Sequence, residues 1–240
     1  MKTELFLAET RGHADHGWLD THHTFSFADY CNPARVQFGA LRVVNDDIVA
    51  PDKGFGTHPH DNMEIVSIPL RGALRHRDSM GNGSVIRSGE VQVMSAGTGI
   101  THSEFNANSE EDVNFFQIWI FPNKRDVTPR YEQKKIECPQ NHLVQIVSPD
   151  AGKAGVWMHQ AAWFHMGHFD AQRGFDYALK RQGDGLFAMV VEGRFDVAGH
   201  TLGRRDAVGI TDADTVSFKS LSSGGQILLI EVPMAGDFPK

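Results

Sequence analysis

The sequence has little cysteine. Cys31 and Cys138 are the only two in 240 residues, which excludes a framework of several disulfides and a cysteine-based zinc site. A single bridge between them stays open, but two reduced thiols are the expectation for a cytosolic protein. Neither thiol has a histidine at a spacing that indicates a catalytic pair, although His142 follows Cys138 by four residues. The cysteines therefore predict neither a disulfide framework nor a catalytic nucleophile.

Long apolar runs and blocks of like charge are also absent. No stretch approaches the length of a membrane span, and residues 1–11 are too short and too charged for the apolar part of a signal peptide. There are 23 basic against 30 acidic residues, a net charge of −7, and no block of five or more like charges. This balance argues against a direct nucleic-acid surface. We therefore expect a monomeric, cytoplasmic protein without membrane or nucleic-acid partners.

Short apolar stretches separated by glycine turns fill most of the chain. Residues 63–70 are apolar on both strand faces except at Glu64, Ser67 and Pro69, and they predict a strand buried on both faces. Residues 113–121 predict a long aromatic strand. Short strands at this spacing indicate a sandwich or small barrel. The charged residues 122–138 indicate a connection between two halves of similar pattern. The sequence therefore predicts an all-β protein with a duplicated β unit.

Two short histidine triplets point to a metal site. His58-Pro59-His60 and His102-Ser103-Glu104 each place two metal-binding side chains two residues apart. On a strand, residues at this spacing share one face, whereas on a helix they diverge by about 200°. Both triplets therefore work as chelating pairs only on β-strands. Three imidazoles and one carboxylate suit a divalent first-row metal: iron, nickel, copper, manganese, cobalt or zinc.

Several neighbouring polar residues are open to more than one interpretation. Glu64 follows His60 by four residues and competes with Glu104 as the carboxylate ligand, and spacing alone does not decide between them. Gln117 is the one polar residue in the middle of the aromatic strand, so it is either a satisfied core amide or a group that lines the pocket. The pair Asp46-Asp47 is expected in a solvated turn that ends the strand at 38–44. A looser set of histidines lacks chelating spacing and is interpreted as structural: His159, His165 and His168.

At these residues the chain resembles the pirin family of the cupin superfamily. The resemblance covers about residues 11–121 and is carried by five stretches: RGHADHGWLD (11–20), FGALRV (38–43), HPHDNME (58–64), HRDSMG (76–81) and MSAGTGITHSEFN (94–106). The general cupin motifs fit with departures, since Gly54 stands too close to His58 and two extra residues precede His102. In pirins the carboxylate ligand follows the histidine of the second motif by two residues, which here is Glu104. The second half is similar to the metal-free second cupin of that family.

The resemblance implies a bicupin, with two jelly-roll β-barrels packed face to face, a metal-holding domain at residues 1–134 and a metal-free domain at 135–240. It implies one iron(II) bound by His58, His60, His102 and Glu104, with Glu64 and Gln117 near the ligands or the pocket. Pirins are associated with quercetin 2,3-dioxygenase activity, so the expected partners are O2 and a small aromatic substrate, a flavonol or similar enol or phenol, with Glu104 as catalytic base. The alternative that the family implies is an iron-dependent regulator without enzymatic activity, which binds a protein partner.

Overall fold

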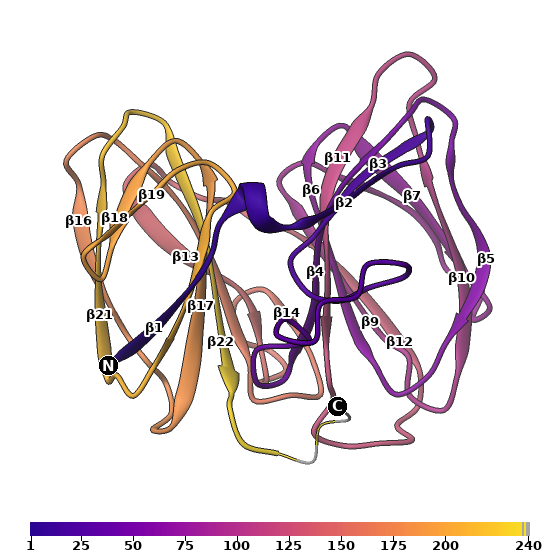
Figure 1. Cartoon of the computed structure of the whole chain (residues 1–240). Coiled ribbons are helices and arrows are strands. Elements are labelled where there is room, and N and C mark those ends of the chain that lie inside the picture. The colour runs from indigo at the N-terminus through magenta and orange to yellow at the C-terminus, as the bar shows by residue number, and fades with distance from the viewer. Residues whose placement is uncertain (237, 239–240) are drawn as a thin grey trace.

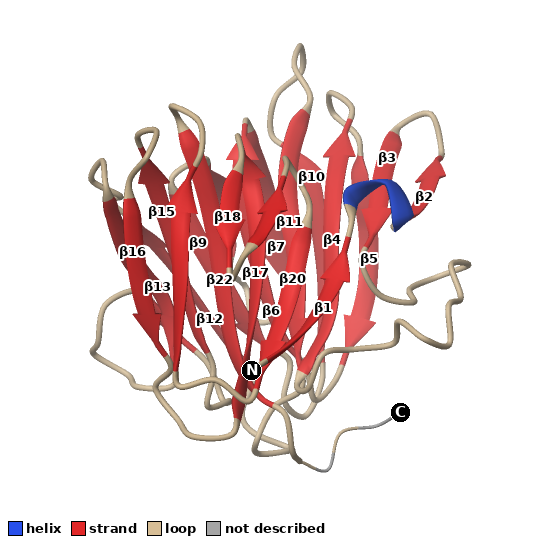
Figure 2. Ribbon diagram, turned by 60° about the vertical axis from the view of Figure 1, so that its left-hand side comes forward, coloured by secondary structure: helices blue, strands red, loops and turns tan. Residues whose placement is uncertain are grey.

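The computed structural model of the protein describes residues 1–236 and 238, and its two halves lie side by side (Figure 1). Strands and loops make up nearly all of the described part, where the one short helical turn is the 3-10 segment η1 (Ala8–Thr10) (Figure 2). Each half stacks a seven-stranded sheet on a four-stranded one. The predicted all-β fold of two packed jelly rolls is confirmed. No helix within the described residues has both the length and the apolar character of a membrane span.

The first half supplies the two sheets that hold the histidine triplets. Its seven-stranded sheet has the order β12 (Arg130–Lys135), β9 (Glu90–Ser95), β6 (Glu64–Arg71), β11 (Val113–Ile120), β4 (Leu41–Val49), β3 (Leu19–His23) and β2 (Gly12–Asp15). Its four-stranded sheet has the order β5 (Gly54–His60), β10 (Ile100–Asn106), β7 (Ala73–Asp78) and β8 (Gly83–Arg87). The segment 122–138, predicted as a connection, contains the strand β12. This strand belongs to the first half because it pairs with β9 along its whole length.

The second half repeats this arrangement. Its seven-stranded sheet has the order β1 (Lys2–Phe6), β20 (Ala207–Thr211), β17 (Asp184–Glu192), β22 (Gly225–Pro233), β15 (Trp163–Phe169), β13 (His142–Ser148) and β14 (Val156–Trp157). Its four-stranded sheet has the order β16 (Gly174–Ala178), β21 (Thr215–Ser220), β18 (Phe195–Val197) and β19 (His200–Leu202). The edge strand β1 comes from the start of the chain and pairs with β20, so the first residues complete the sheet of the second half (Figure 1).

The largest apolar core lies between the two seven-stranded sheets. It combines Val66, Ile68 and Phe116 of the first half with Phe164 and Phe187 of the second. On β6 the alternate residue Ile65 points the other way and packs in a separate core inside the first half. Strand β6 is therefore buried on both faces, as the apolar run at residues 63–70 predicts. The shared core hides apolar strand faces that each half alone would expose.

The prediction of a solvated turn at Asp46 and Asp47 is wrong, because β4 continues through both residues to Val49 and both are buried. Adjacent strand residues point to opposite faces. Asp46 points toward the second half, where Arg205 Nε donates to Asp46 Oδ2 at 2.6 Å. Asp47 points into the first half and accepts a hydrogen bond from Thr21 Oγ1. The partners of both carboxylates lie far away in the sequence, so local composition gave no sign of them.

Candidate metal centre

Strands β5 and β10 bring the two histidine triplets together. They pair antiparallel with His58 opposite His102 and His60 opposite Ile100. The ring centroids lie 4.4 Å apart for His58 and His102, and 4.9 Å apart for His60 and His102. Ligand-capable atoms of the three side chains all lie within 4.8 Å of one another. The spacing of two residues thus does place both members of the first triplet on one face, with His102 facing them.

Glu104 is buried and lies next to this cluster, beside His102. The pairing of β10 with β5 shifts between His102 and Glu104, whereas the pairing of β10 with β7 stays regular, with Glu104 opposite His76. Glu104 shares a second group of ligand-capable atoms, again within 4.8 Å, with His76 and His102. The two groups overlap in His102. Of the four predicted ligands, three therefore form one group, and Glu104 is linked to them through His102.

Hydrogen bonds orient two of the imidazoles with one nitrogen left free. The Nδ1–H group of His58 donates to the carbonyl of Gly56 at 2.7 Å, so Nε2 carries the lone pair. His102 Nδ1 lies 3.5 Å from Nδ1 of the buried His76, whose Nε2 is 3.1 Å from Asp78 Oδ2. His102 Nε2 is buried and has no hydrogen-bond partner among the described residues. An orphaned imidazole nitrogen beside two further imidazoles fits a bound metal ion, whose ligating histidines typically have the other nitrogen held by a neighbour.

Burial sets the charge state of the cluster. It lowers the pKa of His60 to about 4 and the pKa of His102 to about 2, with the nearby His58 as the next cause for each. Both imidazoles are therefore neutral at physiological pH, which is the form that binds a metal. Burial also raises the pKa of Glu104 to about 7, against the opposing effect of hydrogen bonds from Ser67 and Gln117. The site combines neutral nitrogen donors with one carboxyl group that has no cationic partner among the described residues.

Gln117 and Ser67 hold the carboxyl group of Glu104. Gln117 Nε2 donates to Glu104 Oε2 at 2.7 Å, and Ser67 Oγ lies 3.1 Å from Glu104 Oε1 and 2.7 Å from Gln117 Oε1. They belong to a polar row that crosses the larger sheet on neighbouring strands: His23, Asn45, Gln117, Ser67 and Gln92. Gln117 is therefore both a buried amide with its hydrogen bonds satisfied and a group that lines a cavity, so the two interpretations of this residue hold together.

Glu64 is not brought into this cluster. It begins β6 after a turn that separates it from His60, and its side chain is buried with Ser95 Oγ donating to Oε2 at 2.8 Å. His159 Nδ1 of the second half lies 3.5 Å from Glu64 Oε1. Neighbouring Val66 and Ile68 share the face of Glu64 and belong to the core between the halves. The expected common face with His60 fails because the intervening turn breaks the regular strand.

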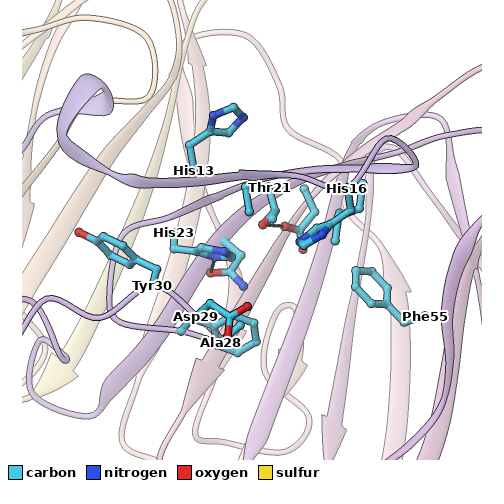
Figure 3. Close-up of a pocket in the computed structure, with 13 residues that line it drawn as sticks. His13, His16, Thr21, His23, Ala28, Asp29, Tyr30 and Phe55 are labelled. Carbon is cyan, nitrogen blue, oxygen red and sulfur yellow. Dashed lines mark hydrogen bonds between the residues drawn. The ribbon is translucent and has the colours of Figure 1, made fainter.

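Two adjoining cavities lie beside the histidines. A small one of about 70 Å3 is lined by His58, His60 and Glu104 together with Gln117 and Trp119. A larger one of about 390 Å3 lies under the hairpin formed by β2 and β3, with residues 27–30 on its other side. Figure 3 shows Thr21 and His23 on the inner side of this hairpin and His13 above it. The cavity at the metal centre therefore adjoins a larger one, and both are partly open to the surface.

Two residues of this region were missed by sequence analysis. His76 is fully buried next to His102, and its partner Asp78 stands two residues on, the same spacing as in the predicted ligand pairs. That repeated spacing was a usable signal. Trp119 packs edge-on against His60, with ring centroids 4.9 Å apart, and only its position in the aromatic strand could have indicated it.

The histidines of the second half do not gather around one point. His165 is buried and packs edge-on against Tyr177, with ring centroids 5.0 Å apart. His159 reaches the first half at Glu64, and His168 stands opposite His142 in the strand pairing. Their surroundings agree with a structural interpretation of these three residues.

Comparison with known proteins extends the likeness to both halves. The family model called Pirin matches residues 6–120, and the model of the quercetinase C-terminal cupin domain matches residues 145–232. A quercetin 2,3-dioxygenase from Escherichia coli K12 is 41% identical over 231 residues, 95% of this chain and 98% of the relative. The crystal structure of the bacterial pirin YhhW from Escherichia coli with nickel(II) has a TM-score of 0.92 at 38% identity and covers 98% of this chain and 100% of that one. A quercetin 2,3-dioxygenase from Acinetobacter baumannii shares the fold, with a TM-score of 0.77 at 21% identity, over 96% of this chain and 79% of that one.

Proposed function

Because the chain belongs to the pirin family of the cupin superfamily, we propose that it is a metal-dependent dioxygenase of the quercetin 2,3-dioxygenase type. The substrate is a flavonol or a similar enol or phenol. The observation that carries this proposal is the buried Nε2 of His102, which has no hydrogen-bond partner in the described part of the chain and lies beside His58 and His60, two imidazoles that line a cavity. Fold alone does not determine activity, so the argument depends on this site.

The metal ligands are His58, His60, His102 and Glu104. Iron(II) is the proposed ion, with nickel as the first alternative because a close relative binds nickel(II), followed by copper, manganese, cobalt and zinc. When bound, the ion would supply Lewis-acid charge and redox capacity toward dioxygen. The neutral imidazoles and the single carboxylate leave a net positive centre, which favours an enolate or phenolate oxygen.

Glu104 is proposed as the base that accepts the hydroxyl proton of the substrate at Oε1. In the metal-free protein burial raises the pKa of Glu104 to about 7, and a bound ion would lower this pKa and keep the carboxylate ionised, which is the form that accepts a proton. Once Oε1 carries the proton it can donate to Ser67 Oγ, and Ser67 then donates to Gln117 Oε1 at 2.7 Å. Gln117 Nε2 keeps Oε2 in place throughout. Ser67 and Gln117 thus position the base.

Aromatic side chains form the walls that would hold a flat substrate. Phe27 packs edge-on against Trp119 with ring centroids 5.3 Å apart, and Phe55 lies across the small cavity. A pocket with such aromatic walls favours an enzyme. The rival function, a regulator that binds a protein partner through its iron state, would need only a surface beside the metal.

We further propose a division of the chain into a metal-holding domain at residues 1–134, whose first strand β1 crosses over to complete the sheet of the other half, and a metal-free domain at 135–240, with one metal ion per chain. Among the described residues, the groups of three or more side chains whose ligand-capable atoms lie within 4.8 Å of one another all belong to the first half. We propose a monomer in the cytoplasm, with O2 and a small aromatic molecule as partners and no nucleic acid.

Turnover of quercetin tests the activity. Iron(II)-loaded protein is expected to consume O2 with quercetin and to release carbon monoxide, whereas Glu104→Gln under identical iron loading is expected to lose most of this activity. Equal O2 uptake by both proteins would assign the reaction to free iron or autoxidation. If iron-replete wild type turned over none of several flavonols and retained a partner protein in a pull-down, the regulator would replace the enzyme.

A further inference from the structure

The cavity at the histidines is too small for a whole flavonol. Its volume is about 70 Å3, whereas pockets for drug-sized ligands measure about 300–1,000 Å3. The neighbouring cavity of about 390 Å3 falls within that range. Four residues line both cavities and so form the boundary between them: Phe27, Asn45, Asp47 and Phe55. A substrate whose reacting end meets the histidines therefore has space for the rest of its body in the larger cavity, past these four side chains.

Two of the four are polar and stand side by side on one strand face. Asn45 and Asp47 are two residues apart on β4, and both are buried. One end of each side chain is fixed by strand β3, since Thr21 Oγ1 donates to Asp47 Oδ1 and His23 Nδ1 lies 2.9 Å from Asn45 Oδ1. These two bonds appear as dashed lines in Figure 3. Both side chains are therefore held in place before any ligand arrives.

The other end of each side chain has no partner within residues 1–236 and 238. Asp47 Oδ2 is a free acceptor, and Asn45 Nδ2 is a free donor. A hydroxyl group both donates and accepts, so it can satisfy the two atoms at once. Leaving them unsatisfied against an apolar ligand would cost free energy, because buried polar atoms need partners.

We infer that Asp47 Oδ2 and Asn45 Nδ2 form a subsite for a hydroxyl group of the substrate, remote from the oxygen that meets the histidines. This inference depends on the proposed function for the identity of the reacting end, but not for the existence of the subsite. The rings of Phe27 and Phe55 flank it and suit a phenol. The substrate class is then a polyhydroxylated aromatic compound, and a compound that carries only the reacting hydroxyl is discriminated against.

Binding of a fragment tests the subsite without turnover. The probe is resorcinol, whose two hydroxyls are too far apart to chelate one ion, added to full-length protein loaded with zinc and followed by ligand-observed NMR. Wild type is expected to bind it. Asp47→Asn keeps the shape and the bond from Thr21 but replaces the free acceptor by a donor, so its affinity is expected to fall about tenfold or more. The control is Asp20→Asn, because Asp20 lies on the outer side of the same hairpin, bonded to His13, and should bind as wild type does.

Exchange of the two side chains separates recognition from a structural role. The double variant Asp47→Asn/Asn45→Asp restores one donor and one acceptor in exchanged places, so it is expected to bind resorcinol within about threefold of wild type. Circular dichroism and zinc content confirm that each variant is folded and loaded. No binding by wild type, equal binding by Asp47→Asn, or no recovery in the folded double variant would each overturn the subsite.

Substrate preference gives the second measurement. The ratio of kcat/KM for quercetin to that for 3-hydroxyflavone, which lacks the remote hydroxyls, is expected to be about ten or more in wild type and to approach one in Asp47→Asn. An equal loss for both compounds in Asp47→Asn would contradict a role in specificity. If wild type turned over neither compound, the proposed function would fail, while the resorcinol experiment would still decide on the subsite.

Discussion

Gln117 Nε2 donates a hydrogen bond of 2.7 Å to Glu104 Oε2. The two residues come from facing sheets, Gln117 from β11 and Glu104 from β10, so the bond ties these sheets together at the histidine cluster. Glu104 is fully buried, and within the described residues no cationic side chain pairs with it. A buried carboxyl group in this setting is stable when it is protonated or when a metal ion neutralises it. The metal-free and metal-loaded proteins should therefore respond to pH in opposite ways.

Metal-free Glu104→Gln is expected to be more stable than metal-free wild type above neutral pH. The pKa of Glu104 is about 7 in the folded protein, above its ordinary value of 4.5. Its contribution to stability is therefore fully present below about pH 4.5 and is lost as the pH rises through 7. The glutamine has no charge to bury, so its advantage should grow from nothing at pH 4.5 to on the order of 3 kcal/mol at pH 8. Denaturant unfolding across this pH range measures the difference.

The exposed Glu110 provides the matched control for that experiment. Glu110→Gln changes a carboxylate in the loop before β11 and should leave the pH dependence of unfolding as in wild type. Loading with metal should reverse the order of stability, because the ion stabilises the ionised carboxylate of wild type but not the amide. Parallel stability curves for metal-free wild type and Glu104→Gln would show that Glu104 is not a desolvated carboxyl group.

Removal of His102 is expected to abolish tight metal binding and to leave the fold intact. The apolar cores supply most of the folding free energy, and His102→Ala removes one nitrogen donor without touching them. Metal content by mass spectrometry, with circular dichroism as a check on folding, measures the effect. His165→Ala is the control, since His165 is a buried histidine in the second half. Full metal content in His102→Ala would show that His102 is not a ligand. Loss of metal in His165→Ala would place the ion in the second half instead of the first.

Substitution of Glu64 should leave the metal in place. Its carboxyl group contacts Ser95 and His159 on the face of β6 that meets the second half, opposite the face that carries Ser67. We expect Glu64→Gln to retain at least nine-tenths of the wild-type metal content and Glu104→Gln to lose most of it. Elemental analysis of both variants, purified in parallel, gives the answer. The reverse result would make Glu64 the carboxylate ligand, as in the general cupin pattern.

Arg205 is expected to stabilise the contact between the two halves. Its side chain reaches Asp46, Asn114 and the carbonyl of Val191, and it is almost completely buried. Arg205→Met leaves Asp46 with only the more distant Arg11, whose Nη1 lies 3.9 Å from Asp46 Oδ2, which should cost about 3 kcal/mol in the free energy of unfolding. The neighbouring Arg204 pairs with Glu192 on the surface, so Arg204→Met should cost less than about 1 kcal/mol.

A second substitution tests the cause of that loss. Arg205→Met combined with Asp46→Asn also removes the buried carboxylate that has lost Arg205, and should recover part of the stability. Equal effects of Arg204→Met and Arg205→Met, or an additive loss in the double variant, would contradict a buried ion pair between the halves.

The periodic parts of the fold were predictable because burial leaves a pattern in the sequence. The run at residues 63–70 is apolar on both faces of β6, and the spacing of His58 and His60 requires a strand. Glu64 was different, since counting four residues from His60 assumes a regular strand, and a turn at 61–63 intervenes. Asp46 and Asp47 were misjudged because charged residues in a row usually indicate solvent. Their burial depends on Arg205 and Thr21, which lie far away in the chain and are brought close only by the fold.

Anomalous diffraction at the absorption edge of the metal, from crystals of the protein purified from its own host, tests the metal centre most directly. The account predicts one strong peak per chain, about 2.0–2.2 Å from nitrogen atoms of His58, His60 and His102 and from a carboxylate oxygen of Glu104. The surface group of His13, Asp20 and His22 also gathers ligand-capable atoms within 4.8 Å and gives the comparison point within the described residues. A principal peak at that group or beside His165, with none among His58, His60 and His102, would contradict the account.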